Sequence, residues 1–411
     1  MMKTAFEALV IGGGPAGATA ALLLARAGWR VAVAEKTVFP RRKVCGEFLS
    51  ATNWPLLEEL GLADEFYARA GPEVRQIGLF AGKTILSSAM PRLRNDAGGW
   101  GRALGREQLD TLLLAHAADA GATVLQPWSI VALARQGDHF LCRAVSRESP
   151  GNRELRARIV IAAHGSWEVG PLPTQLRRQR IRPSDLLGFK AHFRNCQLSP
   201  GLMPLLVFPG GYGGMVESDA GRVSLSCCIR RDQLERSRAE WPSMSAGEAV
   251  LSHIRNSCLG VQEALAGANQ EGAWLSAGPI RPGIRTARAD GIFLVGNAAG
   301  EAHPIVAEGI SMAMQSAWLL CDHLVARRKE VLTVERVGHV ARDYASDWRR
   351  IFSPRIRVAA LFAQAATRPA ARIAALSILR HFPALLSAGA EWSGKVNQVI
   401  SAERLRQSPV L

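Results

Sequence analysis

The sequence predicts an α/β fold in which a parallel, doubly wound sheet carries an inserted antiparallel sheet and is followed by a helical C-terminal region. Three observations predict this architecture. A glycine-rich strand, turn and helix open the chain, continuously apolar strands return at residues 157–163 and 292–295, and short strands separated by Gly and Pro turns occupy residues 183–280. Because 411 residues are long for one core, we expect more than one domain.

The start of the chain follows the pattern of a dinucleotide-binding βαβ unit. An apolar strand runs into the turn Gly-Gly-Gly-Pro-Ala-Gly that begins at Gly12, and a helix follows. Gly12 permits the tight turn, Gly14 lets the backbone approach a pyrophosphate, and Gly17 lets the helix pack closely on the strand. The second strand ends at Glu35, whose carboxylate would accept hydrogen bonds from ribose hydroxyls. The unit is Rossmann-like, and the phosphates would lie at the positive end of the helix.

A basic loop follows Glu35. It holds Arg41, Arg42 and Lys43 and turns at Cys45 and Gly46. Positive charge beside a dinucleotide site would favour its phosphates. An ordinary solvated loop remains the alternative for each of the three basic side chains.

The elements that follow include a hairpin, a helix and two further candidate strands of the nucleotide-binding sheet. Residues 75–90 have the pattern of a hairpin, and residues 112–120 that of a helix. The apolar strand 157–163 suits a buried parallel strand. It ends at His164, and open α/β sheets bind ligands at such carboxyl ends. The strand 292–295 leads into Gly-Asn-Ala-Ala-Gly, where small residues would again allow a close approach of backbone to ligand.

The C-terminal segment, from Tyr344 onward, is helical, basic and amphipathic in pattern. Two interpretations stay open. The helices could form a layer packed on the sheet, or they could present a face to a membrane or a lipid-like substrate.

Charge and cysteine content exclude several classes of protein. The formal net charge is +15, and the basic residues are spread along the chain without interleaved aromatics, so nucleic acid is the least favoured partner. Seven scattered cysteines without a CxxC pair indicate neither a disulfide framework nor a zinc site, and we expect no metal. Glu7 interrupts the N-terminal apolar run, and no uncharged run is long enough to span a bilayer. We expect a cytoplasmic protein, with contact at the membrane periphery as the alternative.

Four features in chain order resemble the superfamily of FAD-dependent aromatic hydroxylases and geranylgeranyl reductases, which share the para-hydroxybenzoate hydroxylase fold. They are the GGGPAG turn with its acid, the stretch PRRKVCGE from Pro40, Arg106 ahead of Leu-Asp, and GNAAG followed by Pro304 and a Gly-Ile pair. The resemblance covers the chain to about residue 330.

The resemblance implies FAD as the cofactor. The cofactor-binding residues that it implies, together with the turn and loop positions above, are Gly12, Gly14, Ala16, Gly17, Glu35, Lys36, Arg42, Cys45, Gly46, Arg106, Ile130, Gly296, Asn297, Pro304, Gly309 and Ile310. Within this set Ile130 would contact the adenine, Asn297 the ribityl chain or pyrophosphate, and Ile310 the isoalloxazine edge. His164 and Asn297 stand where the superfamily usually has Asp. The change at His164 bears on the handling of the nicotinamide cofactor, and the change at Asn297 removes a charge beside the flavin.

The function that the resemblance implies is an NAD(P)H-using monooxygenase. It would hydroxylate a hydrophobic aromatic or polyketide-like molecule with dioxygen through a flavin hydroperoxide, in a site from which water is excluded. Cys45 and His303 are candidates near the reacting flavin, although Cys45 could equally be a small residue at a tight turn. Substrate candidates on the inserted sheet are Phe189, Lys190, Phe208 and Tyr212, with core packing as the alternative for both phenylalanines.

Other functions remain as alternatives. One is a reductase of isoprenoid double bonds, and another is a non-catalytic FAD-binding protein. Halogenation is disfavoured, because the WxWxIP motif of the related halogenases does not occur.

The predicted domains follow from these elements. The FAD-binding domain comprises residues 1–74, 101–182 and 281–330, the substrate domain comprises a hairpin at 75–100 and the antiparallel sheet at 183–280, and the helical region comprises 331–411.

Overall fold

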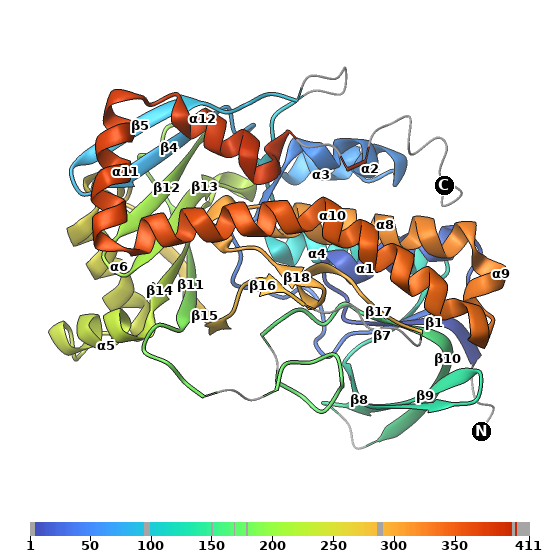
Figure 1. The fold of residues 1–411 in the computed structure, drawn as a ribbon. Helices are drawn as coiled ribbons and strands as arrows, with labels where there is room; N and C mark the ends of the chain where they lie inside the picture. The colour runs from blue at the N-terminus through green and yellow to red at the C-terminus, as the bar shows by residue number, and fades with distance from the viewer. Residues whose placement is uncertain are drawn as a thin grey trace.

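A computed structural model describes residues 5–93, 99–148, 151–167, 169–177, 180–285, 291–396 and 399–400, apart from the side chains of residues 334 and 335. Two large sheets lie at opposite ends of the molecule, and the C-terminal helices run across both of them (Figure 1). The predicted α/β class is confirmed, with a Rossmann-like sheet, a second sheet and a helical C-terminal region.

The first sheet is the predicted nucleotide-binding sheet. Its order is β7-β2-β1-β10-β9-β8, with β17 paired to β10. The strands are β1 Ala5–Ile11, β2 Val31–Ala34, β7 Thr123–Leu125, β8 Trp128–Gln136, β9 His139–Ser146, β10 Asn152–Ala162 and β17 Ile292–Leu294. The apolar half of β10 pairs in parallel with β1 on one side and β17 on the other, as its continuous apolar run predicts. Because β10 lies between them, the turns after β1, β10 and β17 emerge at one edge of the sheet.

Three helices pack together beside this sheet. They are α1 Pro15–Arg26, α4 Arg106–Asp119 and α8 Gly309–Ala326, and α1 contacts both of the others. The structure starts α4 at Arg106, earlier than the predicted helix, which places that side chain in the first helical turn and beside the start of α1.

The second sheet contains the antiparallel sheet predicted for residues 183–280, joined to the early hairpin by one parallel strand pair. Its order is β15-β11-β14-β13-β12-β4-β5, and β12 runs parallel to β4 while the other neighbours are antiparallel. The strands are β4 Gln76–Ala81, β5 Thr84–Ala89, β11 Leu186–Arg194, β12 Leu202–Phe208, β13 Gly211–Glu217, β14 Val223–Arg230 and β15 Asn269–Ile280. The early hairpin β4–β5 pairs with this sheet. We therefore propose that residues 75–100 belong to the same domain as residues 183–280, as in the domain limits predicted from the sequence.

Helices cover the second sheet from two sides. One group is α5 Arg231–Glu240, α6 Ala246–Ser257 and α7 Leu259–Ala264, which share a core with the sheet. The other group belongs to the C-terminal region, which comprises α9 Arg328–Val331, α10 Val334–Thr367, α11 Pro369–His381, α12 Leu385–Ala390 and a π-helical turn, Glu391–Lys395. Helix α10 crosses from the first sheet to the second (Figure 1), and α12 contacts β4 and β5.

The remaining elements are short. They are β3 Phe48–Leu49, β6 Arg102–Ala103, β16 Gly283–Ile284, β18 Gly300–Glu301, α2 Trp54–Glu59, α3 Ala63–Arg69 and four 3-10 turns. In the part of the chain that the structure describes, no helix combines the length and the hydropathy that crossing a bilayer requires.

Candidate cofactor and substrate site

A continuous cavity of about 1000 Å³ joins the two sheets. At one end its walls come from the turns after β1, β2 and β10, and at the other end from β4, β12, β13 and the inner sides of α11 and α12. The first end carries most of the charged groups. The second end is a chamber lined mainly by apolar side chains, including Leu79, Leu205, Leu376, Leu379 and Leu386.

The glycine turn lies on the cavity wall at the start of α1. Gly14 is the N-cap residue, no side chain caps the helix and no acid lies in its first turn. A Cβ at Gly14 would face the guanidinium groups of Arg106 and Arg41 at 3.5 and 3.8 Å. By contrast, a Cβ at Gly17 would overlap the carbonyl oxygen of Gly12, so Gly17 is required for packing. A helix N-terminus flanked by two cations fits a pyrophosphate.

Glu35 lies beside this turn, at the end of β2. Its carboxylate accepts hydrogen bonds from the backbone amide of Gly13 at 2.9 Å and from the Thr37 hydroxyl at 2.7 Å. Burial alone would raise the pKa of Glu35, but nearby Arg41 and these hydrogen bonds lower it overall. Lys36 also lines the cavity, and burial lowers its pKa. An ionised carboxylate at this place suits a ribose.

Arg106 is held by a buried ion pair. It donates two hydrogen bonds of 2.7 Å to Asp110, one turn along α4. Burial acts to lower the pKa of Arg106, but the Asp110 carboxylate outweighs it, and the pKa is raised. Arg41 lies 3.5 Å from Asp110, and its buried Nε has no partner within the described residues. The two cations therefore retain donors for an anionic ligand.

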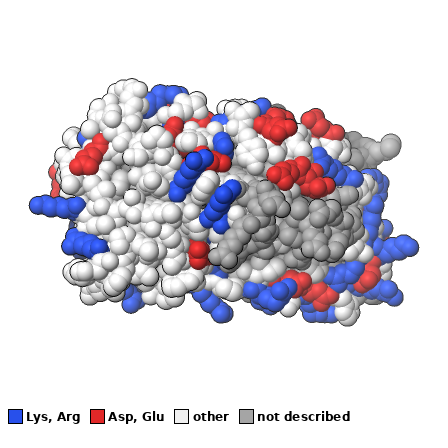
Figure 2. Space-filling model, turned by 90° about the horizontal axis from the view of Figure 1, so that it is seen from above, with Lys and Arg blue, Asp and Glu red and all other residues white. Residues whose placement is uncertain are grey.

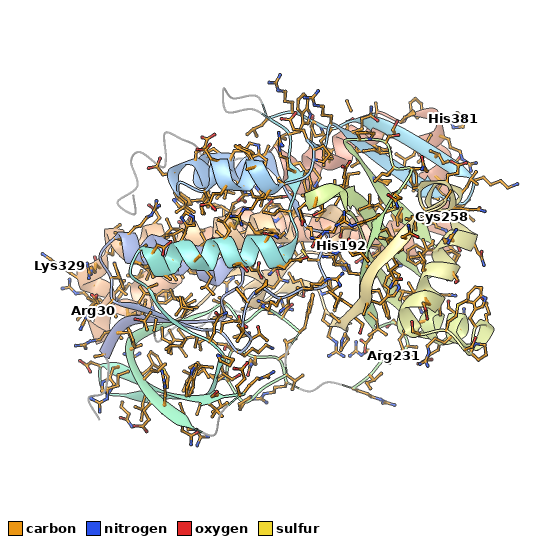
Figure 3. All side chains as sticks on the ribbon, turned by 180° about the vertical axis from the view of Figure 1, so that it is seen from behind. Arg30, His192, Arg231, Cys258, Lys329 and His381 are labelled. Carbon is orange, nitrogen blue, oxygen red and sulfur yellow. The ribbon has the colours of Figure 1, made fainter. Side chains whose placement is uncertain are left out.

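The turn at Cys45 and Gly46 lies on the cavity wall, and Glu47 follows it with a left-handed backbone, φ 65°. Glu47 is 1% exposed. It pairs with Lys190 of β11 and accepts a 2.8 Å hydrogen bond from His192 Nε2. Burial would raise the pKa of Glu47, yet His192 and Lys190 lower it strongly. Figure 3 shows His192 where the second sheet meets the end of α4.

This network changes the interpretation of two predicted residues. Lys190 is fully buried in its ion pair and does not line the cavity, and Arg42 points to His192 Nδ1, at 3.0 Å, instead of the cofactor end. Successive residues of an extended loop point to opposite sides, so Arg41 and Lys43 face the cavity. Burial and neighbouring cations lower the pKa of Lys43 to about 8.

Two further turns complete the cofactor end. Gly296 and Asn297 follow β17, and Pro304, Gly309 and Ile310 lie before and within the first turn of α8; all five line the cavity, as do Ala16 and Ile130. His164 also lies on the wall, and burial lowers its pKa to about 4. Its two ring nitrogens lie 2.9 Å from the Gly165 carbonyl and from the Thr174 hydroxyl. Both nitrogens therefore have partners within the protein, as expected for a structural histidine.

A tyrosine–histidine pair stands where the cofactor end meets the apolar chamber. The Tyr212 hydroxyl lies 3.1 Å from His303 Nδ1, and both residues line the cavity. Burial lowers the pKa of His303 to about 4 and raises that of Tyr212 well above its usual value. Both groups are therefore neutral at physiological pH, and the pair can exchange a proton with a ligand without a charged resting state.

The remaining substrate candidates are placed differently. Phe189 and Phe208 lie in the core between the second sheet and helices α6 and α7. Neither residue is on the cavity wall. This placement agrees with the core-packing alternative, since apolar side chains on the helix-covered face of a strand are buried there.

Sequence reasoning missed several residues that line the site. Glu301, Arg372 and Lys395 are on the wall, and the last two come from the C-terminal helices. Lys395 donates to the Val306 carbonyl at 2.8 Å and to Glu308 at 3.0 Å, so the π-helical turn that contains it is fastened to the loop before α8. The amphipathic pattern of α11 could have indicated an apolar wall, but it does not say what that wall faces.

Together, the glycine turn, the acid after β2 and the cations facing the cavity define a dinucleotide-binding flavoprotein site. The chain matches the family described as FAD binding domain over residues 5–336. It therefore belongs to this family of FAD-dependent proteins.

Curated relatives have several functions. The chain is 26% identical over 325 residues to a tryptophan 2-halogenase of Chondromyces crocatus, covering 77% of this chain and 60% of that protein. It is 28% identical over 331 residues to digeranylgeranylglycerophospholipid reductase 2 of Methanopyrus kandleri, covering 75% and 74%. The chain spans about 60% of the length of the first two curated relatives that it matches.

Solved structures share the fold. The myxobacterial chondrochloren halogenase CndH has a TM-score of 0.72 at 21% identity, with 94% of this chain and 90% of that chain covered. PqsL, a probable FAD-dependent monooxygenase from Pseudomonas aeruginosa, has a TM-score of 0.70 at 19% identity, with 91% and 100% covered. At such identities the likeness concerns the fold alone.

Proposed function

We propose that this chain is an FAD-dependent oxidoreductase, and specifically a monooxygenase that uses NAD(P)H and dioxygen to hydroxylate a hydrophobic aromatic or polyketide-like molecule. The observation that carries the proposal is one continuous cavity, in which the cofactor end opens directly into a mainly apolar chamber. Bound FAD would supply the electron transfer and oxygen activation. The residues of the chain would bind the cofactor, orient the substrate and exclude water.

The Tyr212–His303 pair is the proposed polar element of the substrate end. It lies on the chamber wall with no charged form at physiological pH. A phenol or enol of the substrate could give or receive a proton there. Cys45, on the wall near Arg106, keeps its proposed place near the flavin, and the predicted residues Ile310 and Pro304 line the same stretch of the cavity.

The test uses isotopically labelled dioxygen and a panel of phenols and polyketide-like aromatics with the FAD-loaded protein and NADH or NADPH. The reaction balances when substrate, dioxygen, NAD(P)H and a proton give hydroxylated substrate, water and NAD(P)⁺. Label in an organic product supports the proposal. Consumption of NAD(P)H that yields only hydrogen peroxide with every acceptor would count against the proposal. The variant His303→Gln should lower the product yield more than it lowers the FAD content.

Halogenation is the second candidate, because both a curated relative and a solved structure with this fold are halogenases. Lys43 and Lys395 both line the cavity, although the WxWxIP motif is missing. The same assay run with chloride or bromide separates the two reactions. A product that gains halogen in place of hydrogen identifies the halogenase, and a product that gains oxygen identifies the monooxygenase.

Alkene reduction remains a third possibility on the strength of the reductase relative. The apolar chamber could hold an isoprenoid chain. Reduction of a geranylgeranyl lipid under strictly anaerobic conditions would identify this reaction, since neither of the other two proceeds without oxygen. A protein that binds FAD and shows none of the three reactions would be a non-catalytic carrier.

We also propose that the C-terminal helices touch an anionic membrane surface, from which a hydrophobic substrate could enter. Residues 348–390 contain seven arginines and no acidic residue. Ile378 of α11, Leu385 of α12 and Trp392 are 52%, 42% and 64% exposed and also line the cavity, so the chamber reaches the surface among apolar side chains. Figure 2 looks down on this end and shows a broad, mostly uncharged area. Apolar anchors with nearby cations are typical of interfacial binding.

Vesicle flotation tests this contact. The variant Ile373→Gln/Phe382→Gln changes two side chains that are 68% and 63% exposed, so the fold should persist. It should reduce co-flotation with vesicles containing phosphatidylglycerol, while the matched control Val38→Gln, on the first domain, should not. Equal flotation of all three proteins would remove the membrane proposal. Deletion of residues 387–411 is a poor test, because Lys395 within that segment is a buried ion-pair partner.

A further inference from the structure

A buried carboxylate, Glu301, connects the turns that follow β10 and β17. It is 4% exposed and forms part of the cavity wall. On one side it accepts hydrogen bonds from Ser166 Oγ at 2.7 Å and Trp167 Nε1 at 3.1 Å. On the other side it accepts a hydrogen bond from Asn297 Nδ2 at 3.1 Å. Arg285 adds a cation 3.4 Å from Glu301 and donates to the Asn297 carbonyl at 2.6 Å.

The contact with Glu301 decides how Asn297 is oriented. A carboxylate can only accept hydrogen bonds, so it selects the NH₂ end of the Asn297 side chain. If the amide turned over, its oxygen would face the carboxylate, and a buried hydrogen bond would be exchanged for the repulsion of two acceptors. Oδ1 is therefore the polar atom that Asn297 can offer to a ligand in the cavity that it lines.

The backbone of the same turn is fixed as well. Gly296 donates its amide hydrogen to Ser316 Oγ at 2.8 Å, and Arg285 holds the next carbonyl. Because both the main chain and the amide are held, the acceptor is preorganised before any ligand arrives.

We propose that Glu301 is a positioning residue for FAD, which fixes Asn297 so that its Oδ1 accepts a hydrogen bond from a hydroxyl of the ribityl chain. Glu301 acts through Asn297 and does not need to touch the cofactor. The inference depends on FAD binding, which the family establishes, and it is independent of which reaction the enzyme performs.

Two single variants, which exchange the amide and the carboxylate group, and the double variant that combines them test the proposal. Asn297→Asp places two carboxylates about 3 Å apart and should weaken FAD binding on the order of tenfold. Glu301→Gln removes the group that selects the amide orientation and should also weaken it. In the double variant, the introduced glutamine amide can donate to the introduced aspartate carboxylate, which keeps an oxygen for the ligand. The double variant should therefore bind FAD about fivefold more tightly than Asn297→Asp alone.

Affinities are measured by fluorescence titration of apoproteins whose folding has been checked by circular dichroism. Glu263→Gln, which removes an exposed carboxylate, is the control and should bind as the natural chain does. If Glu301 only stabilises the fold, the two losses will add, and the double variant will be the weakest. That outcome, or unchanged affinity in Asn297→Asp, overturns the proposal.

The pH dependence gives a second readout that a loss of structure would not imitate. Two adjacent carboxylates share a raised pKa, so the Asn297→Asp variant should regain FAD affinity as the pH falls from about 8 to about 5.5. The natural chain and the double variant, which have one carboxylate each at this place, should show a smaller change. A parallel decline of all three proteins with falling pH would contradict the assignment.

Discussion

Replacing Arg106 by alanine should affect both the stability of the protein and its affinity for FAD. Arg106 is 9% exposed and makes two 2.7 Å hydrogen bonds to Asp110, which is fully buried. Removing one partner of a buried ion pair costs about 3–5 kcal/mol, because the other charge is left unpaired. Arg41 remains 3.5 Å from Asp110, so we expect a loss near the lower end, about 3 kcal/mol of unfolding free energy.

The loss of stability can be separated from the loss of cofactor binding. Arg106→Ala/Asp110→Asn removes the unpaired charge and should recover about 1–2 kcal/mol of the unfolding free energy. It should not recover FAD affinity, which we expect to fall by about 1.5–3 kcal/mol in both variants, since a charge-assisted contact is lost. Urea denaturation of the apoproteins and fluorescence titration with FAD measure the two quantities.

A matched control is available on the surface. Arg69 and Glu65 form an ion pair with the same four-residue helical spacing, but the two side chains are 46% and 44% exposed, and Arg69→Ala should change stability by less than about 1 kcal/mol. The reasoning is refuted if Arg106→Ala is as harmless as Arg69→Ala. If FAD affinity is normal in the folded double variant, Arg106 is not a cofactor residue.

Three further predictions test other parts of the site. Gly14→Val should abolish FAD retention and leave the apoprotein folded, because its Cβ would meet two guanidiniums at ordinary contact distances. Gly17→Val should prevent folding, and equal FAD content in Gly14→Val would refute the first expectation. Burial lowers the pKa of His164 and His303 from 6.5 to about 4, so between these pH values the unfolded chain binds more protons than the folded one. The unfolding free energy should therefore decrease as the pH falls from 6.5 to about 4, and it should decrease less in His303→Gln. Glu47→Gln leaves a buried lysine without its carboxylate and should lower the unfolding free energy by about 3–5 kcal/mol in urea titrations; a smaller change than Arg69→Ala gives would refute this.

Local patterns were sufficient for the nucleotide-binding end of the protein. The turn from Gly12 to Gly17 and the acid at Glu35 are close in sequence, and their spacing is fixed by one strand, one helix and one more strand. The structure therefore places them together without contributions from distant segments. Ile310 and Asn297 could be added only through the resemblance, because a sequence does not reveal which distant turns share an edge of a sheet.

Side-chain direction and long-range pairing were decided by the tertiary structure. Arg42 and Arg41 are equivalent in sequence, yet only Arg41 faces the cavity, because the direction of a loop residue depends on what packs on each side. Lys190 can be buried because its ion-pair partner is the carboxylate of Glu47, whose backbone is left-handed and which lies 143 residues away in the sequence.

The sequence by itself determined the class of fold and the glycine turn, since each depends on short-range periodicity and spacing, and FAD followed from the resemblance that the four motifs carry. Only the tertiary structure decided that α11 and α12 close the apolar chamber and that Glu301 holds Asn297. The physical reason is that cavity walls and buried charge networks are assembled from segments whose separation along the chain carries no local signal. Helix α11 illustrates this, because an amphipathic pattern predicts a helix but does not say whether its apolar side meets a core, a cavity or a membrane.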